Sequence, residues 1–360
     1  LIRVMAQQLF GSSFNEDKQL ITFSDSVQDA AHRAGFFTSR TYPLLIRSLL
    51  AKVISDKVLE DSSHKEKTSL AKLSRLVGES ALDLSADDKA FVGTYIAPDM
   101  QWQNHYKYLL KNGKLPEKSQ LVKNIQNRLA WELFSEFGLK AKLGRSLDKS
   151  LFATINYPQE ALAKACLDIH SCITEEIELL VNISPKIIEQ FVIGVLHLMR
   201  LNGAVFHPAL YSYVSSGGDT YVMNKVGKDQ FYMPNLGRAS RRPRFVSINR
   251  VSNSFDSINK KSINKKSSNN TPYLVCLYKT IIEGEKVFAS NEAVLIFERT
   301  FSSLLQHQII MARESKGEPV YGLNPDSLLL TCDIKQLKCD VCSTLLIVAD
   351  SLEDYWIDSP

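Results

Sequence analysis

The sequence predicts a mixed fold that is predominantly α-helical with small β elements. A strand–turn–helix pattern opens the chain, apolar residues recur at helical spacing over most of it, and short β patterns lie near its end. The 360 residues are enough for about two or three domains. No apolar run approaches the ~20 residues that cross a bilayer, and six cysteines in a chain of this length do not indicate a disulfide scaffold. We therefore expect a reduced, cytoplasmic protein with no membrane partner.

The opening pattern joins a short strand, residues 20–24, to a helix that begins near Asp25 or Ser26. Ser26 and Asp29 fit a capping box, and the small polar turn lies where a helix N-terminus exposes unpaired N–H groups. Such a turn can hold a phosphate. The polar groups further along the solvent side of the helix are Gln28, His32 and Arg33. The same pattern also fits a capped helix with a solvated face, and both interpretations stay open at this point.

Changes in composition and periodicity divide the chain into six segments. They are residues 1–50, 51–182, 183–247, 248–271, 272–331 and 332–360. The second segment is expected to be helical, with a helix that ends at Gly138 and another that is opened by Pro158. The fourth is low in apolar residues and rich in lysine, asparagine and serine, which favours a basic linker.

The segment 183–247 carries the order helix, turn, helix, β-hairpin, which is the order of a winged helix. Ser184 and Pro185 begin a long apolar helix that Gly203 ends. "HPALYSYVSSGG" predicts a second, shorter helix, and "DTYVMNKVGKDQFYMPN" predicts two strands around Gly227. A second, less supported unit of this kind is expected over 272–331. There "NEAVLIFERTFSSLLQHQIIMARES" predicts a helix and "EPVYGLNPDSLLLT" predicts a hairpin.

Positive charge gathers after the second helix of the first winged-helix-like unit. The net charge of the chain is only +4, so any affinity for nucleic acid must come from such clustering. The candidate phosphate-contacting residues are Lys225, Lys228, Arg238, Arg241, Arg242 and Arg244. Because the second helix itself is almost uncharged, the pattern indicates backbone contact more than base reading. The alternative is a winged helix that only packs against its neighbours, followed by a solubilising linker.

Cys339 and Cys342 form a C-x-x-C pair after a predicted strand. Two thiolates at this spacing can share a tetrahedral zinc if two more ligands come from elsewhere, which favours a partial zinc ribbon over 332–360. Cys332 could be a third ligand, but its position in a strand fits core packing equally well. A redox pair is less favoured, because no helix pattern begins at Cys339. The cysteines expected in the core are Cys166, Cys172 and Cys276.

The stretch "LITFSDSVQDAAHRAGFF", residues 20–37, resembles the beginning of the second RecA-like domain in large bacterial DEAD/DEAH-box helicases of superfamily two. These are the long members found in anti-phage defence and DNA-repair loci. There, a strand reading like "LLTFSDSRQDA" opens the domain, and the turn after it contacts the backbone of the bound strand. The resemblance places Ser24 and Asp25 in that turn and Gln28 at the start of the next helix. Val27 departs from the pattern, since relatives often carry arginine there.

The resemblance implies a fragment of an ATP-dependent helicase or translocase. Residues 1–50 would begin the second RecA-like domain, and the rest would be an insertion that carries winged-helix-like units and, as in related helicases, a cysteine cluster for zinc. The expected partners are DNA, with RNA as the alternative, and the other domains of the parent helicase. ATP and magnesium would belong to the parent, since this segment has no G-x-x-x-x-G-K-[ST] loop, no Asp-Glu-Ala-Asp-like box and no arginine-rich motif.

Two other classes of protein stay open. One is a non-enzymatic winged-helix protein that binds nucleic acid or acts as an adaptor. The other is a helical scaffold with no nucleic-acid role. On the helicase interpretation, this segment alone should be inactive as an ATPase, because the groups that hold ATP are missing from it.

Overall fold

The computed structural model describes residues 27–56, 68–100, 108–109, 111–141, 146–224, 232–234, 236, 242–259, 271–281, 290–338 and 345–355. The predicted strand over 20–24 lies outside these residues. Within them the fold is mostly helical with small sheets, as the sequence predicts.

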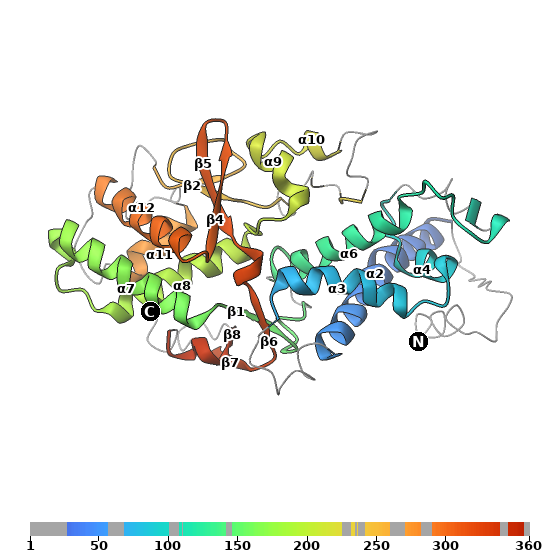
Figure 1. Ribbon diagram of the computed structural model, residues 1–360, viewed down its shortest axis with the longest axis horizontal. Helices are drawn as coiled ribbons and strands as arrows, with labels where there is room; N and C mark the ends of the chain where they lie inside the picture. Colours follow the sequence, from blue (N-terminus) through green and yellow to red (C-terminus); the bar gives the residue numbers. More distant parts are fainter. Residues whose placement is uncertain are drawn as a thin grey trace.

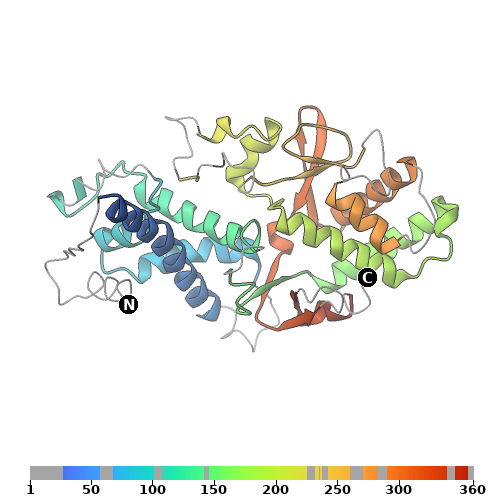
Figure 2. The ribbon, with the colours of Figure 1, turned by 180° about the vertical axis from the view of Figure 1, so that it is seen from behind.

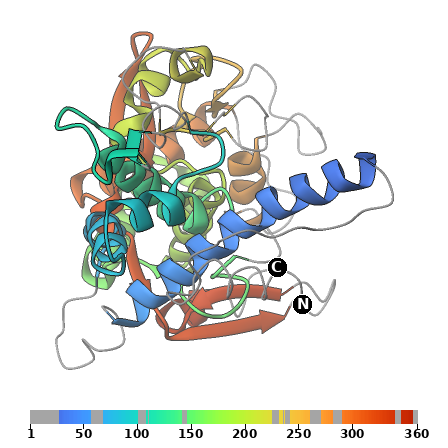
Figure 3. The same cartoon turned by 90° about the vertical axis from the view of Figure 1, so that its right-hand side faces the viewer.

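One group of helices gathers at one end of the molecule (Figure 1). Its members are α2 (Val27–Ile54), α3 (Leu70–Asp83), α4 (Asp88–Tyr95) and α6 (Leu121–Phe137). Leu73 and Val77 of α3 are fully buried and lie four residues apart, so they share one face of the helix. That face meets α6 so closely that a Cβ on Gly78 would lie 2.9 Å from the Cβ of Gln126. Figure 3 shows α2 as one long helix that extends past its neighbours.

A second group of helices surrounds the apolar helix α8 at the other end of the molecule (Figure 1). Its long members are α7 (Gln159–Glu176), α8 (Pro185–Leu201), α11 (Pro272–Ile281) and α12 (Ser290–Gln306). The short helix η2 (Glu178–Leu180) follows α7, while η3 (Pro208–Leu210), α9 (Tyr211–Ser215) and α10 (Tyr221–Asn224) lie between the two groups, where α9 contacts β4 (Figure 1). A Cβ on Gly194 of α8 would lie only 2.7 Å from the sulfur of Cys276 on α11, so the lack of a side chain allows the two helices to approach. Cys166 is buried as expected, whereas Cys172 and Cys276 are half-buried.

Several helix boundaries are where capping signals in the sequence put them. The helix α6 ends before Gly138, α7 begins after Pro158, and Pro185 is the first residue of α8. The end of α8 is a Schellman motif, because Gly203 has a positive φ of 69° and its N–H reaches the carbonyl of Arg200 at 2.9 Å. The predictions for these boundaries are confirmed.

The main sheet has four strands in the order β3-β2-β5-β4. They are β2 (Val246–Ser247), β3 (Asp256–Ser257), β4 (Ile310–Ser315) and β5 (Glu318–Leu323). Strands β4 and β5 form an antiparallel hairpin whose turn residues, Lys316 and Gly317, have φ angles of 53° and 83°. Positive φ at both positions is the geometry of a type I′ turn, which matches the twist of a tight hairpin.

Two smaller sheets complete the fold. One pairs β1 (Thr154–Asn156) with β6 (Leu329–Thr331), and the other pairs β7 (Ile334–Lys338) with β8 (Leu345–Ala349), both antiparallel. The remaining 3₁₀ turns are η5 (Pro325–Ser327) and η6 (Asp350–Tyr355). Figure 2 shows β7 and β8 at the opposite edge of the molecule from α9 and the β4–β5 hairpin.

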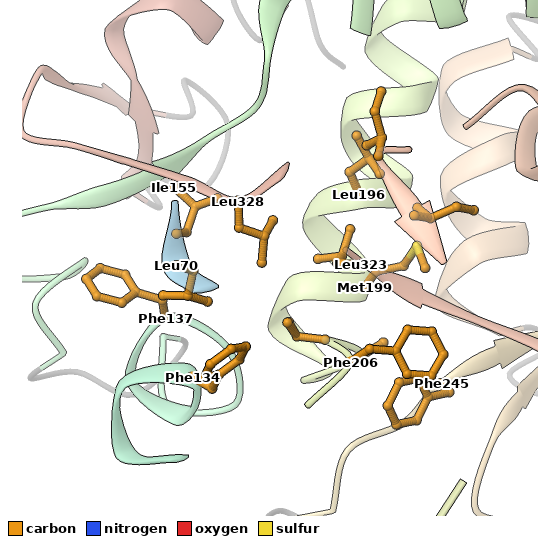
Figure 4. Packing of buried hydrophobic residues seen from close by; sticks show 14 of the residues in the cluster. Leu70, Phe134, Phe137, Ile155, Leu196, Met199, Phe206, Phe245, Leu323 and Leu328 are labelled. Atoms are coloured by element: carbon orange, nitrogen blue, oxygen red, sulfur yellow. The ribbon is translucent and has the colours of Figure 1, made fainter. Parts of the chain in front are cut away.

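One hydrophobic core runs through both groups of helices. Figure 4 shows side chains from α3, α6, α8, β5 and the connections between them packing together. Phe137 of α6 and Leu70 of α3 lie on one side, while Met199 of α8, Phe206 and Leu323 lie on the other. Because these residues come from segments far apart in the sequence, the core depends on long-range packing rather than on any one segment.

Two predictions for the segments after α9, a strand over 221–224 and a linker over 248–271, do not agree with the structure. Residues 221–224 were predicted to be a strand and form the helical turn α10, because the Asp219 carboxylate accepts a hydrogen bond from the N–H of Tyr221 at 2.9 Å and caps it. The sequence favoured a linker over 248–271. Phe255 and Ile258 are nevertheless buried, and β3 pairs with β2 in parallel, so residues 248–259 belong to the packed fold.

The predicted helix over 291–315 and the hairpin after it are also wrong in their bounds. The helix α12 ends at Gln306, where Gln308 adopts a positive φ of 57°. The N–H groups of Gln308 and Ile309 reach the carbonyls of Leu305 and Leu304, which is a Schellman motif without glycine. The hairpin therefore joins β4 to β5, and β6 leaves to pair with β1.

A network of buried charges ties α6 to its surroundings. Arg128 forms ion pairs with Glu132 at 2.8 Å and with Asp99 at 2.9 Å, and its guanidinium donates a hydrogen bond to the carbonyl of Tyr232 at 3.0 Å. Lys140 forms a second ion pair with Glu132. Burial disfavours the ionised carboxylate of Glu132, but the charges of Lys140 and Arg128 outweigh it and lower the pKa from 4.5 to about 2.

We predict that Arg128→Ala lowers the free energy of unfolding by about 3 kcal/mol. Removing one partner of a buried ion pair costs about 3–5 kcal/mol, and the low end applies because Lys140 still pairs with Glu132. Chemical denaturation measures the loss. The control is Lys123→Ala, an exposed position on the same helix, which should change stability by less than about 0.5 kcal/mol. Equal losses in both variants would contradict the network's role.

Candidate nucleic-acid interface

The structure gives no side-chain contacts for the residues that were expected to bind phosphate near the polar turn. Ser24 and Asp25 lie outside the described residues. Gln28 and Arg33 lie in the helix α2, which begins at Val27, and the contacts of their side chains are outside the described part. The phosphate-binding role of the predicted turn therefore stays a prediction.

The predicted basic cluster is described at two of its positions. Lys225, Lys228, Arg238 and Arg241 lie outside the described residues. Arg242 donates a hydrogen bond from Nε to the carbonyl oxygen of Leu236 at 3.1 Å.

Arg244 has a structural partner that the sequence did not indicate. Its guanidinium lies 2.6 Å from one carboxylate oxygen of Asp256, a residue only 5% exposed on β3. The hydrogen bond to Asp256 raises the pKa of Arg244. The other carboxylate oxygen, Oδ2, is buried with no hydrogen-bond partner in the structure. Because the side chain of Arg244 is 41% exposed, it both neutralises a buried acid and reaches the surface.

The predicted zinc ligands are not tested by the described residues. Cys339 and Cys342 lie outside them. Cys332 is half-buried just after β6, and burial raises the pKa of its thiol. Among the described residues no group of three or more histidine, cysteine, aspartate and glutamate side chains could hold a metal ion.

A groove lies between α9 and β4, which the sequence did not indicate. Its volume is about 620 Å³, and its lining residues are Tyr211, Ser212, Val214, Ser215, Met311, Ala312, Arg313 and Glu314. The Cζ atom of Arg313 lies 3.4 Å from the centre of the Tyr211 ring, which is a close cation–π contact. Finding this pair required knowing that residues 310–315 form a strand beside α9, whereas the sequence pattern indicated a helix there.

Contacts from several elements hold α9 in place. The Ser315 hydroxyl on β4 donates a hydrogen bond to the carbonyl of Val214, and the Tyr213 hydroxyl donates one to the carbonyl of Pro243 at 2.9 Å. Just before α9, His207 caps η3, because its Nδ1 accepts a hydrogen bond from the N–H of Ala209 at 3.2 Å. We call α9, the β4–β5 hairpin and residues 242–259 the α9 surface.

Five basic side chains belong to the α9 surface. They are Arg242, Arg244, Arg250, Arg313 and Lys316. Within the described part of the chain, neither Arg313 nor Lys316 forms an ion pair. The acidic residues Glu314 and Glu318 lie on the same hairpin as Arg313 and Lys316, so this surface carries both signs of charge and is not uniformly positive.

The comparisons with known proteins return no relative. No protein-family model, no curated protein and no solved structure matches the chain. Within the described residues no helix has both the length and the apolar character needed to span a bilayer.

We predict that acid destabilises the protein in part through His207. Its ring is buried against Trp131 and Phe134, and burial lowers its pKa from 6.5 to about 4. The unfolded state therefore binds a proton that the folded state does not, and this group's share of stability is lost as pH falls from 6.5 toward 4. The slope is about 1.4 kcal/mol per pH unit.

Urea unfolding at pH 7, 6 and 5 measures this effect. The variant His207→Gln should show a shallower loss of stability than the wild type between pH 6.5 and 4.5, whatever its stability at pH 7. His197, whose pKa is also lowered by burial, to about 3, contributes equally to both proteins. Identical slopes in the two proteins would contradict the prediction.

We also predict that Arg244→Ala destabilises the fold independently of any ligand. The change leaves the buried carboxylate of Asp256 without its partner, at a cost of about 1–3 kcal/mol. Arg250→Ala, which removes an exposed arginine bonded only to Asn253, should cost less than about 0.5 kcal/mol. Thermal unfolding of the two variants tests this. If Arg244→Ala unfolds at the wild-type temperature, the ion pair has no structural role.

Proposed function

We propose that this chain is part of an ATP-dependent helicase or translocase of superfamily two and contributes contacts to the backbone of DNA, with RNA as the alternative substrate. The observation that carries this proposal is the resemblance of residues 20–37 to the beginning of a second RecA-like domain. It is consistent with the helix α2 (Val27–Ile54), which follows Ser24, Asp25 and Ser26 in the sequence. A helix that starts there offers its N-terminal N–H groups to a phosphate.

The α9 surface supports backbone contact by the rest of the chain. Its basic side chains come from three separate segments, and two of them, Arg313 and Lys316, form no ion pair within the described residues. Four further basic residues of the predicted cluster flank it in sequence, between α10 and β2. Phosphate contacts need positive charge without a requirement for base-reading geometry. The surface fits that role better than any other described part of the chain.

The order α11, α12 and β4–β5 hairpin is consistent with a winged helix, and we propose that the hairpin rather than α12 faces nucleic acid. A recognition helix needs a free face, but α12 packs against α7. Arg299 of α12 pairs with Glu176 at 2.6 Å, and His307, just after α12, lies 2.7 Å from the carboxylate of Asp168. These contacts hold α12 against α7 through Arg299 and His307 and leave neither side chain free to enter a groove of DNA.

Fluorescence anisotropy with a labelled single strand and a labelled duplex tests the proposal across a salt series. The 360-residue chain should bind with an affinity that falls steeply with salt. The quadruple variant Lys225→Ala, Lys228→Ala, Arg238→Ala and Arg241→Ala should weaken binding at least tenfold and reduce the salt slope by about 3–4 if each residue contacts one phosphate. Arg244 is kept because its loss would destabilise the fold.

A matched control removes the same charge elsewhere. Lys111, Lys114, Lys118 and Lys123 are exposed and lie in or near α6, away from α9. Changing these four to alanine should leave affinity and salt slope close to wild type. No salt-sensitive binding by the wild type, or the same loss in both quadruple variants, would contradict the proposed function.

A further inference from the structure

The groove between α9 and β4 has the chemistry of a site for a planar anionic ligand. One wall carries the hydroxyls of Tyr211, Ser212 and Ser215, and the other carries the Arg313 guanidinium. The volume of about 620 Å³ is within the 300–1,000 Å³ range typical of small-molecule sites.

Arg313 is held with hydrogen-bonding capacity to spare. Its guanidinium stacks on the Tyr211 ring at 3.4 Å and lies 5.9 Å from the centre of the Phe206 ring. Its Nε is buried and has no hydrogen-bond partner in the structure. Within the described residues Arg313 has no carboxylate partner, so the terminal amino groups of its stacked guanidinium, rather than the buried Nε, can donate to an acceptor from outside.

The fold fixes where this arginine stands. Arg313 lies opposite Val320 in the β4–β5 register, and β4 is the outer strand of the four-stranded sheet. Lys316, in the tight turn of the same hairpin, covers Gly217 so closely that a Cβ there would be 2.8 Å from its Nζ. A second cation therefore lies beside Gly217, just beyond the end of α9, although it does not line the groove itself.

The occupant that these features favour is nucleic acid with an unpaired base. Single-stranded nucleic acid binds by stacking its bases on aromatic rings or arginine planes while cations hold the backbone. The stacked pair of Arg313 and Tyr211 supplies the first element and Lys316 the second. The carboxylate of Glu314, which also lines the groove, repels an acidic peptide as much as it repels a phosphate. A peptide of acidic residues, however, has no base that could stack on the Arg313–Tyr211 pair.

We infer that the α9–β4 groove binds an unpaired nucleotide, so that this part of the chain prefers a single strand to a duplex. The inference rests on the proposed function and adds a substrate preference to it. The base stacks at the Arg313–Tyr211 pair, and the adjoining phosphate lies near Lys316.

The test compares Arg313→Lys with Arg75→Lys in the 360-residue chain. The probes are a labelled 12-nucleotide oligothymidylate, a 12-base-pair duplex and a polyglutamate peptide. Lysine keeps the charge but loses the planar stacking face, so Arg313→Lys should weaken single-strand binding about tenfold and change duplex binding less than twofold. Arg75→Lys, an exposed change on α3 and outside the α9 surface, should alter neither.

The outcomes separate the groove from the wider proposal. If the wild type binds no nucleic acid in a salt-sensitive way, the proposed function fails and this inference fails with it. If single strand and duplex bind equally and Arg313→Lys has no effect, only the groove assignment is overturned. If polyglutamate binds as tightly as oligothymidylate and weakens equally in Arg313→Lys, the groove belongs to an acidic peptide, which also overturns the inference. If Arg313→Lys unfolds at the same temperature as the wild type, its weaker binding does not come from a folding defect.

Discussion

The burial of α8 is the constraint on which the rest of the structure depends. This helix is apolar around most of its circumference, and α7, α11 and β5 pack around it, with Gly194 allowing α11 to approach. Its C-terminal Schellman motif turns the chain at Gly203 so that the N–H of Phe206 reaches the carbonyl of Leu323 on β5 at 3.1 Å. That bond ties the end of α8 to the hairpin strand, and α9 follows a few residues later. The end of α8 therefore sets where α9 lies relative to the hairpin, and so where the groove between α9 and β4 forms.

Charge is used in two ways in this molecule. Arg128 and Glu132 are almost completely buried, whereas Asp99 reaches the surface, and the role of these ion pairs is to hold α6 against neighbouring segments. Such networks fix one arrangement more than they add stability, since each ion must leave water. Around α9 the cations are half-exposed, and Arg313 and Lys316 lack acidic partners within the described residues. Arg244 stands between the two cases, because it neutralises Asp256 and still reaches solvent. A study of function at this surface must therefore separate ligand contacts from ion pairs that keep the fold intact.

Local signals in the sequence predicted part of this fold. The helices α6, α7 and α8 follow apolar periodicity and have glycine or proline at their ends, so their existence and bounds could be predicted. The end of α12 could not, because Gln308 takes the left-handed conformation that usually indicates glycine. Because no glycine indicated the end of the helix, the helix prediction continued through β4, and the β4–β5 hairpin was placed wrongly. The pairing of β5 with β2 and of β6 with β1 joins segments far apart in the chain, which no local pattern specifies. The site followed the same rule: the basic residues were visible as a cluster, whereas the stacking of Arg313 on Tyr211 depends on tertiary packing.

The most direct test of the central claim, that the α9 surface contacts nucleic acid, is a hydrogen-exchange footprint of the 360-residue chain with and without a saturating single-stranded oligonucleotide. Backbone amides exchange more slowly where a ligand covers them or stabilises the local fold. We predict slower exchange in α9, β4 and residues 242–259, with no change in α3 and α4. Protection confined to the α3 and α4 region, or no protection at α9 and β4 when binding is saturated, would contradict the claim.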